Sequence, residues 1–97
     1  MYQLIIKPKA IEMAKEAYEW YNEQQAGLGD IFLRELENGY DKLELWPIAY
    51  SKIKRNYRQL ILHTFPYVIV FEIIKKEVVI YSIFHTSLNP RKKFRNK

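Results

Sequence analysis

Apolar positions in the first half of the chain recur at helical spacing. In residues 10–25 apolar side chains recur at intervals of three and four, at Ile11, Ala14, Tyr18 and Tyr21, with Ala10 and Ala17 alongside. This spacing places them on one face of an amphipathic helix, and glutamates occupy the other face. Trp20 lies off the centre of the apolar stripe, so we expect it to be partly exposed.

A second helical pattern follows a break at residues 26–29, which read AGLG. Two glycines there supply the backbone freedom that a tight reversal needs. We expect the helix to start near Asp30, which can cap free N–H groups or lie favourably at the positive end of the helix dipole. Gly39 in its middle predicts close packing or a small kink, and Trp46 and Pro47 end it. The two helices form an antiparallel hairpin.

The spacing then changes to that of extended chain. Strands are predicted at residues 2–7, 58–62, 67–73 and 77–84, which are rich in β-branched and aromatic residues. Short connections join the last three strands, so they form an antiparallel meander. Apolar and polar residues alternate little in residues 67–73, which predicts a central strand that is covered on both faces. We expect the helical hairpin to cover one of these faces. The predicted fold is α+β, in the order β-α-α-β-β-β, with a helical hairpin on a small, mainly antiparallel sheet.

Length and composition limit the possible classes of protein. Ninety-seven residues make one domain, spanning residues 1–97, and the absence of cysteine suits a reducing cytosol. We see no signal peptide. The longest apolar runs, at residues 67–71 and 78–84, are far shorter than the ~20 residues of a membrane helix. We therefore expect a cytoplasmic protein with no membrane partner.

Charge is distributed unevenly along the chain. Residues 10–45 carry nine acids and three bases, a net charge of −6, although the whole chain carries +5. The remaining residues therefore carry +11. One part of the protein is acidic and solvated, and the other is suited to an anionic partner.

A first basic run lies at residues 51–58. It contains four cations and an aromatic residue: Lys52, Lys54, Arg55, Tyr57 and Arg58. Cations at this density could bind phosphate oxygens while the aromatic ring stacks on a base. The alternative is a solvated approach to a strand, with Ile53 and Tyr57 pointing inward.

Two histidines are candidates for chemistry. His63 lies in a predicted turn and is more simply a turn residue, whereas His85 leaves the last strand at the edge of the sheet. Histidine titrates near neutral pH, so His85 could act as a general acid or base, or could equally hydrogen-bond the turn before Pro90. Two histidines without cysteine or a Glu-x-x-His motif predict no metal site. Glycine-rich phosphate loops are also absent, so we expect no cofactor.

The chain ends in the basic stretch FHTSLNPRKKFRNK. Its cations are Arg91, Lys92, Lys93, Arg95 and Lys97. A solvated tail is the simplest interpretation. Leu88, Pro90 and Phe94, however, could hold this basic C-terminal tail against the domain and fix the positions of its charges.

Three stretches together resemble a known family. They are WYNEQQAGLGDIFLREL, YRQLILHTFPYVIVFEI and FHTSLNPRKKF. Their order and spacing resemble the RelE/ParE superfamily of toxins from bacterial type II toxin–antitoxin modules, over nearly the whole chain. Such modules inhibit growth and stabilise plasmids. The resemblance implies the same α+β fold and a cognate antitoxin that wraps the toxin.

The two branches of the superfamily differ in function. RelE-like toxins cleave mRNA on the ribosome without a metal, and ParE-like toxins poison DNA gyrase and lack the catalytic set. RelE-like toxins carry an arginine at two positions that are Val68 and Thr86 here. The Phe65-Pro66-Tyr67 stretch and the ending His85, Pro90, Phe94-Arg95 look ParE-like, although Phe94 replaces the frequent tryptophan.

The resemblance therefore favours a gyrase-directed toxin that is not an enzyme. A RelE-like ribonuclease is the alternative, with His85 or Tyr57 moving protons among the cations of residues 52–58. A third possibility is an inactive toxin fold that has kept only its binding function.

Overall fold

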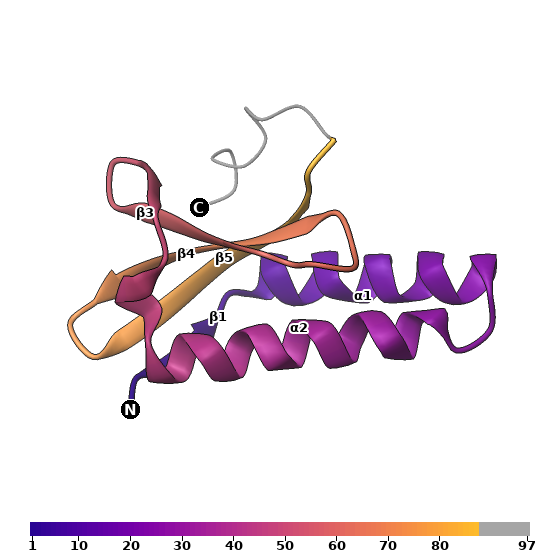
Figure 1. The fold of residues 1–97 in the computed structure, drawn as a ribbon, viewed down its shortest axis with the longest axis horizontal. Helices are drawn as coiled ribbons and strands as arrows, with labels where there is room; N and C mark the ends of the chain where they lie inside the picture. Colours follow the sequence, from indigo (N-terminus) through magenta and orange to yellow (C-terminus); the bar gives the residue numbers. More distant parts are fainter. Residues whose placement is uncertain (88–97) are drawn as a thin grey trace.

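The structure, a computed structural model, describes residues 1–87. Its elements in chain order are β1 (Gln3–Ile6), α1 (Pro8–Gln24), α2 (Leu28–Leu45), the 3-10 helix η1 (Pro47–Ala49), β2 (Lys52–Lys54), β3 (Tyr57–Ile61), β4 (Tyr67–Ile74) and β5 (Glu77–His85). The predicted α+β class and helical hairpin are confirmed (Figure 1). Strand β2 is an addition to the predicted order. Its three residues lie in the first basic run, where no alternation of apolar residues marks a strand.

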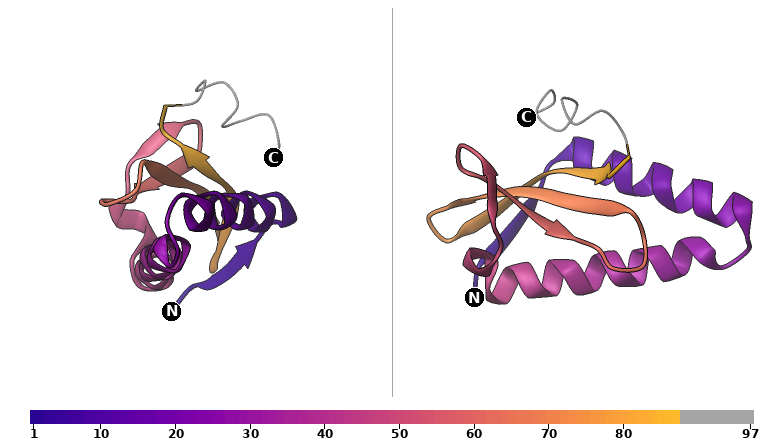
Figure 2. Two further views of the ribbon diagram at one scale, coloured as in Figure 1. Left: turned by 90° about the vertical axis from the view of Figure 1, so that its right-hand side faces the viewer. Right: turned by 45° about the horizontal axis from the view of Figure 1, so that its top comes forward.

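The strands form one five-stranded sheet in the order β1-β5-β4-β3-β2. Strands β3, β4 and β5 make the predicted antiparallel meander, and β4 is central, also as predicted. Strand β1 pairs in parallel with β5, from Gln3 opposite Glu77 to Ile6 opposite Ile80. The first strand of the chain therefore lies beside the last, at the edge opposite the short β2 (Figure 2).

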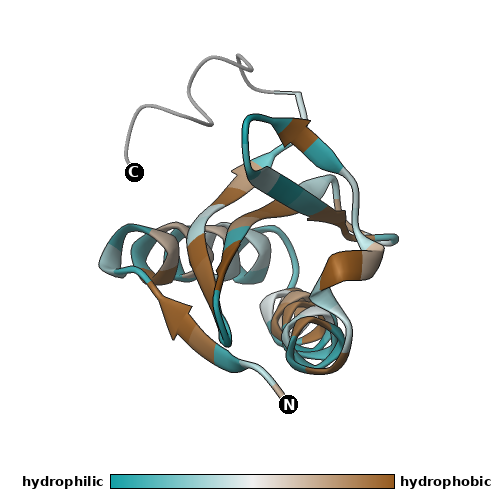
Figure 3. Cartoon of the chain, turned by 90° about the vertical axis from the view of Figure 1, so that its left-hand side faces the viewer, coloured by the Kyte–Doolittle hydropathy of each residue, from teal (hydrophilic) through white to brown (hydrophobic). Residues whose placement is uncertain are grey.

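The two helices lie together on one face of the sheet, as the view along their axes shows (Figure 3). Ile69 and Phe71 of β4 belong to the main core with the buried residues of both helices. Val68 and Val70 belong to a second cluster with Tyr57 and Phe84. Because neighbouring residues of a strand point to opposite faces, this second cluster lies on the face away from the helices. Strand β4 is thus buried on both faces, as predicted.

The buried stripe of α1 differs from the predicted one at Ile11. The residues that are buried are Ala10, Ala14, Ala17 and Tyr21, whereas Ile11 is 57% exposed. The buried positions keep the helical spacing, but the centre of the stripe falls on the alanines, about 100° around the helix from Ile11. Trp20 is 54% exposed, which confirms its predicted position beside the stripe.

The helix boundaries also differ from the predicted ones. Helix α1 begins at Pro8, because proline suits the first turn of a helix. Helix α2 begins at Leu28, two residues before Asp30, and is preceded by Gly27 with φ 87°. Asp30 therefore lies in the first turn, where its charge suits the helix dipole, and it does not cap the helix.

Two glycines let α2 pack closely on its neighbours. A Cβ on Gly29 would overlap the carbonyl oxygen of Tyr18, and its own N–H donates to Asn22 Oδ1 at 2.8 Å. A Cβ on Gly39 would lie 3.0 Å from Ile69 Cδ1. Gly29 thus sets the spacing of the helical hairpin, and Gly39 sets the distance between α2 and the sheet, which confirms the close packing predicted for Gly39.

Candidate functional site

His85 is the last residue of β5 and lies opposite Tyr67, the first residue of β4. The centroids of the two rings are 5.0 Å apart, with 80° between the ring planes. The sheet register therefore fixes both rings at the same end of the sheet, next to α1.

The hydrogen bonds of His85 define its tautomer. Nδ1 accepts from the backbone N–H of Ser87 at 3.1 Å and lies 2.7 Å from the Ser87 hydroxyl. Since Nδ1 is an acceptor, the proton of the neutral ring is on Nε2. Nε2 then has no lone pair for a substrate proton, so this arrangement does not suit a general base.

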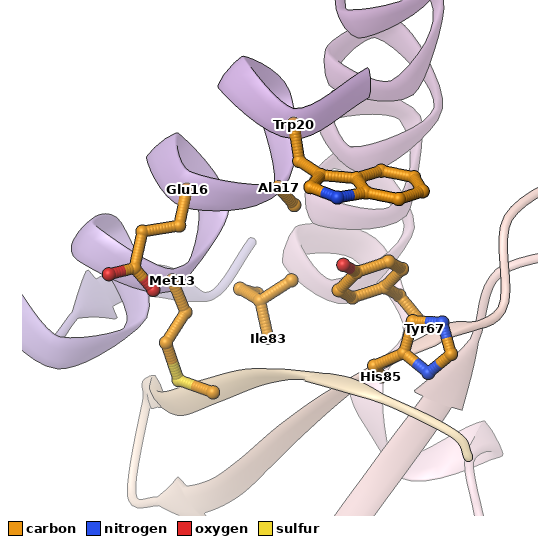
Figure 4. A pocket seen from close by; sticks show the side chains of 7 residues that line it. All are labelled: Met13, Glu16, Ala17, Trp20, Tyr67, Ile83 and His85. Atoms are coloured by element: carbon orange, nitrogen blue, oxygen red, sulfur yellow. The ribbon is translucent and has the colours of Figure 1, made fainter. Parts of the chain in front are cut away.

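An aromatic groove lies between α1 and the ends of β4 and β5. Figure 4 shows the indole of Trp20 above the ring of Tyr67 on one side of the groove, with Glu16 and Met13 on the other side. One part has a volume of about 250 Å³ and is lined by Met13, Glu16, Ala17, Trp20, Tyr67, Ile83 and His85. A second part of about 260 Å³ shares Trp20, Tyr67 and His85 with the first and extends to Tyr21 and Ser87. We use the name aromatic groove for these residues together.

The pKa of Tyr67 is raised by its surroundings in the groove. Burial raises the pKa of Tyr67, and the neighbouring Tyr21 and the Glu16 carboxylate raise it further. The contribution of Glu16 shows that its negative charge acts on the interior of the groove. The groove therefore disfavours anions.

The cations of the first basic run lie at a hairpin between β2 and β3. Lys52, Lys54 and Arg55 are exposed, and Arg55 takes φ 53° in the turn that joins the two strands. The structure thus brings these three predicted site residues together on one projecting hairpin.

Arg58 lies opposite Lys52 in the ladder, but its guanidinium binds the backbone. Its Nη1 donates to the carbonyl oxygen of Tyr50 at 2.6 Å and to that of Ile48 at 3.4 Å. The guanidinium therefore holds η1 against β3. Tyr57, the preceding residue, points to the opposite face, where it is buried with Ile53 packed beside it. The inward positions expected for Ile53 and Tyr57 in the alternative interpretation are thus observed.

The two candidates for proton transfer do not lie together. Tyr57 pairs with Glu72 of β4, and His85 pairs with Tyr67 of the same strand. The five positions from Tyr67 to Glu72 correspond to about 16 Å along the strand. His85 and Tyr57 are therefore too far apart to act on one phosphodiester.

His63 lies in the turn between β3 and β4 and is exposed. Its backbone N–H donates to Glu35 Oε2 at 3.2 Å, and that of Thr64 donates to the same oxygen at 2.9 Å. The contact involves the backbone of the turn, so it supports the structural interpretation of this residue.

The sequence profile of the family described as "ParE toxin of type II toxin-antitoxin system, parDE" matches residues 4–90. The chain belongs to the ParE toxin family. This confirms the resemblance to the RelE/ParE superfamily and its ParE-like branch, and it implies an antitoxin as partner of the toxin.

Solved structures show the same fold. A chain described as "Chromosomal ParDE TA system from P. aeruginosa" matches with a TM-score of 0.80 and 18% identity, over 90% of the toxin and 98% of that chain. The isolated E. coli RelE toxin matches with a TM-score of 0.66 and 15% identity, over 96% of the toxin and 93% of that chain. Among curated protein sequences, no match to the toxin was found.

The two positions at which RelE-like toxins carry arginine have different surroundings in this toxin. Val68 is 2% exposed and pairs with Phe84 in the second cluster. Thr86 follows β5, and its backbone N–H donates to the carbonyl oxygen of Pro66 at 2.8 Å. Position 68 is therefore apolar and buried, on the face of the sheet opposite to the one on which His85 and Tyr67 meet α1.

Several predicted residues lie outside the described part of the toxin. They are Leu88, Pro90, Arg91, Lys92, Lys93, Phe94 and Arg95. Within residues 1–87, no group of three or more potential ligand residues is placed to hold a metal ion. Neither helix in that range is long and apolar enough to cross a membrane.

The sequence interpretation did not place Glu16, Met13 and Tyr67 in a site. They come from α1 and β4, which only the fold brings to the same place. The available signal was Trp20, a large apolar side chain predicted beside the buried stripe.

Proposed function

We propose that this toxin inhibits growth by poisoning DNA gyrase and that a cognate antitoxin neutralises it. The observation that carries the proposal is Val68, which is apolar and buried against Phe84 at a position where RelE-like toxins carry an arginine. Cleavage of RNA by the RelE-like route needs cations there, since they stabilise the negative charge of the transition state. One such group typically contributes about 3–4 kcal/mol.

The geometry of the two proton-transfer candidates supports the same choice. The lone pair of His85 Nδ1 is engaged by Ser87, and Tyr57 is buried at a distance along the sheet. The two residues therefore cannot act together as general acid and general base on one bound substrate. A toxin that acts by binding needs no such pair.

In this proposal the basic surfaces serve for contact with the target. Lys52, Lys54 and Arg55 project from the β2–β3 hairpin. Contacts of this kind to DNA bound by gyrase weaken steeply with salt, because each neutralised phosphate releases counterions. The target implies a cytoplasmic location for the toxin.

The test is expression of the chain alone in a bacterium, with scoring of gyrase cleavage complexes and of the DNA-damage response. We expect both to rise as growth stops. A matched strain should express the chain together with its antitoxin and grow normally. Growth arrest with intact gyrase function would contradict the proposal.

A ribosome-dependent mRNA endonuclease is the second candidate. The grouping of Lys52, Lys54 and Arg55 on one exposed hairpin favours it, because such a group could hold an RNA backbone. In that case, toxin-treated ribosomes should show mRNA cuts at codon positions, slowed about 10²–10⁴-fold by His85→Ala. Without such cuts this candidate is excluded. A toxin fold that only binds its antitoxin would show neither gyrase damage nor mRNA cuts.

The outer edge of β3 is the surface that we propose for the antitoxin. Strand β2 pairs with β3 at Tyr57 and Arg58, and the Gln59 N–H donates to the Ser51 carbonyl oxygen at 3.3 Å. Within residues 1–87, only Leu60 and Ile61 of β3 therefore have β4 as their single strand neighbour. Ile61 at that end is 58% exposed. An antitoxin segment could add a strand there through main-chain hydrogen bonds.

Ile61→Lys should therefore weaken antitoxin binding, measured by calorimetry. Ile11→Lys is the matched control, because Ile11 is equally exposed but lies on α1. Equal affinities of the two variants and the natural chain would rule out this edge.

A further inference from the structure

The aromatic groove has no role in the proposed action on gyrase, and its chemistry differs from that of the basic surfaces. Each of its two parts has a volume near 250 Å³. A water molecule in the liquid occupies about 30 Å³, so the groove can admit the end of a large side chain. Figure 4 shows two aromatic rings, those of Trp20 and Tyr67, on one side of the groove and Glu16 on the other.

The charge at the groove is negative. Glu16 lies one helical turn before Trp20, and both line the same part of the groove. The carboxylate of Glu16 also contributes to the raised pKa of Tyr67. Glu12 and Glu19 lie on the exposed surface of the same helix, as do Lys9 and Lys15, so Glu16 is the acid that lines the groove itself. The groove thus favours a cation, and the phosphates of a nucleic acid would be repelled there.

The shape of the groove favours a planar cation. The faces of Trp20 and Tyr67 carry the negative part of their ring quadrupoles, which attracts a cation placed over them. A guanidinium is flat and weakly hydrated, and it can donate two parallel hydrogen bonds to one carboxylate. A lysine ammonium is compact and strongly hydrated, so it stacks against aromatic rings less well.

We propose that the aromatic groove binds an arginine side chain of a protein partner, with the guanidinium against the rings of Trp20 and Tyr67 and paired with Glu16 across the groove. Charge complementarity selects this occupant, because a carboxylate and aromatic faces line the same opening. The proposal does not depend on gyrase as the target, and its test uses no toxicity measurement.

The test uses the purified full chain and the peptide acetyl-Gly-Arg-Gly-amide, followed by NMR of the backbone and of the Trp20 indole N–H. We expect the peptide to shift the Trp20 and His85 signals, and the same peptide with citrulline, a neutral isostere of arginine, to shift neither. Trp20→Phe and Glu16→Gln should each weaken binding roughly two- to fivefold. Glu19→Gln and Trp46→Phe are the matched controls, since both residues are exposed and neither lines the groove.

Each other outcome overturns the proposal in a specific way. Equal binding of the citrulline peptide would show an apolar groove without charge selection. Equal binding of the corresponding lysine peptide would show that the groove does not select arginine. Binding of adenosine monophosphate instead of the arginine peptide would point to a nucleic acid as the partner. Binding of the peptide only after deletion of residues 88–97 would mean that the basic tail of the same chain is the occupant. If the arginine peptide shifts no NMR signal in the full chain or in the chain without residues 88–97, arginine does not bind.

Discussion

The imidazole of His85 accepts a hydrogen bond at Nδ1 from the backbone N–H of Ser87, two residues further along the chain. The bond closes a short turn at the end of β5 and holds the ring against Tyr67. It also fixes the position of the single proton of the neutral ring. The residue that looked most suited to catalysis in the sequence is thus engaged by its own backbone.

We expect the neutral His85 ring to carry its proton on Nε2. Nitrogen-15 NMR at alkaline pH, where imidazoles are neutral, should show the protonated signal at Nε2, with His63 as an internal comparison. Ser87→Pro removes the N–H donor and should release this preference, whereas Ser87→Ala keeps it. A ring protonated at Nδ1 in the natural chain would contradict the structure.

Asn22 and Gly29 should together determine the stability of the helical hairpin. Asn22→Ala removes the acceptor of the Gly29 N–H and should lower the free energy of unfolding by about 0.5–2 kcal/mol. Gly29→Ala places a Cβ against the Tyr18 carbonyl and should cost about 1–3 kcal/mol. Urea denaturation measures both. Asn38→Ala on the exposed face of α2 is the control and should stay within about 0.5 kcal/mol.

Tyr40 should make the toxin less stable at alkaline pH. Burial raises the pKa of Tyr40 to about 12, above its ordinary value of about 10. Between these values the unfolded chain releases the phenol proton and the folded chain keeps it, so stability falls as the pH rises. Tyr40→Phe should reduce this fall, measured as the free energy of unfolding from pH 9 to 12. Parallel curves for the two proteins would refute this assignment.

Arg58 should contribute to stability and Arg55 should not. Arg58→Ala removes charged hydrogen bonds to two backbone carbonyls and should cost about 1–3 kcal/mol. Arg55→Ala changes an exposed turn residue and should stay within about 0.5 kcal/mol. Thermal melts at matched concentration check both values. If Arg58→Ala melts like the natural chain, the contact with η1 does not stabilise the fold.

The basic tail should matter for activity more than for stability. Deleting residues 90–97 should abolish growth inhibition at matched protein levels, and Arg91→Ala and Arg95→Ala should reduce it without changing thermal melts. Phe94→Ala should reduce it as well, because this side chain is expected to hold the tail in place. A folded, fully toxic deletion variant would leave the tail without a function.

Local spacing predicted the elements whose packing is also local. The helical hairpin and the meander could be predicted because helical and extended patterns change where the chain turns. The pairing of β1 with β5 could not, since no local pattern selects a neighbour so distant in the sequence. Ile11 was misplaced because alanines, with little hydrophobic weight of their own, form the centre of the buried stripe.

The candidate site was predictable only in part. Cations of the β2–β3 hairpin are adjacent in the sequence, so the structure brings Lys52, Lys54 and Arg55 together as expected. Arg58 lies in the same run and opposite Lys52, but its guanidinium binds the carbonyl oxygens of Ile48 and Tyr50, which no local pattern indicates. The aromatic groove joins α1 to two strand ends, and only the folded chain brings Glu16 close to Tyr67.

The parallel pairing of β1 with β5 has a consequence for synthesis of the protein. Gln3 leaves the ribosome well before its partner Glu77. Contacts between such distant segments form late, because a long loop must close before they contribute. A nascent chain can build the helical hairpin early but cannot complete this edge of the sheet. We therefore expect the toxin to complete its native sheet only after β5 has left the ribosome.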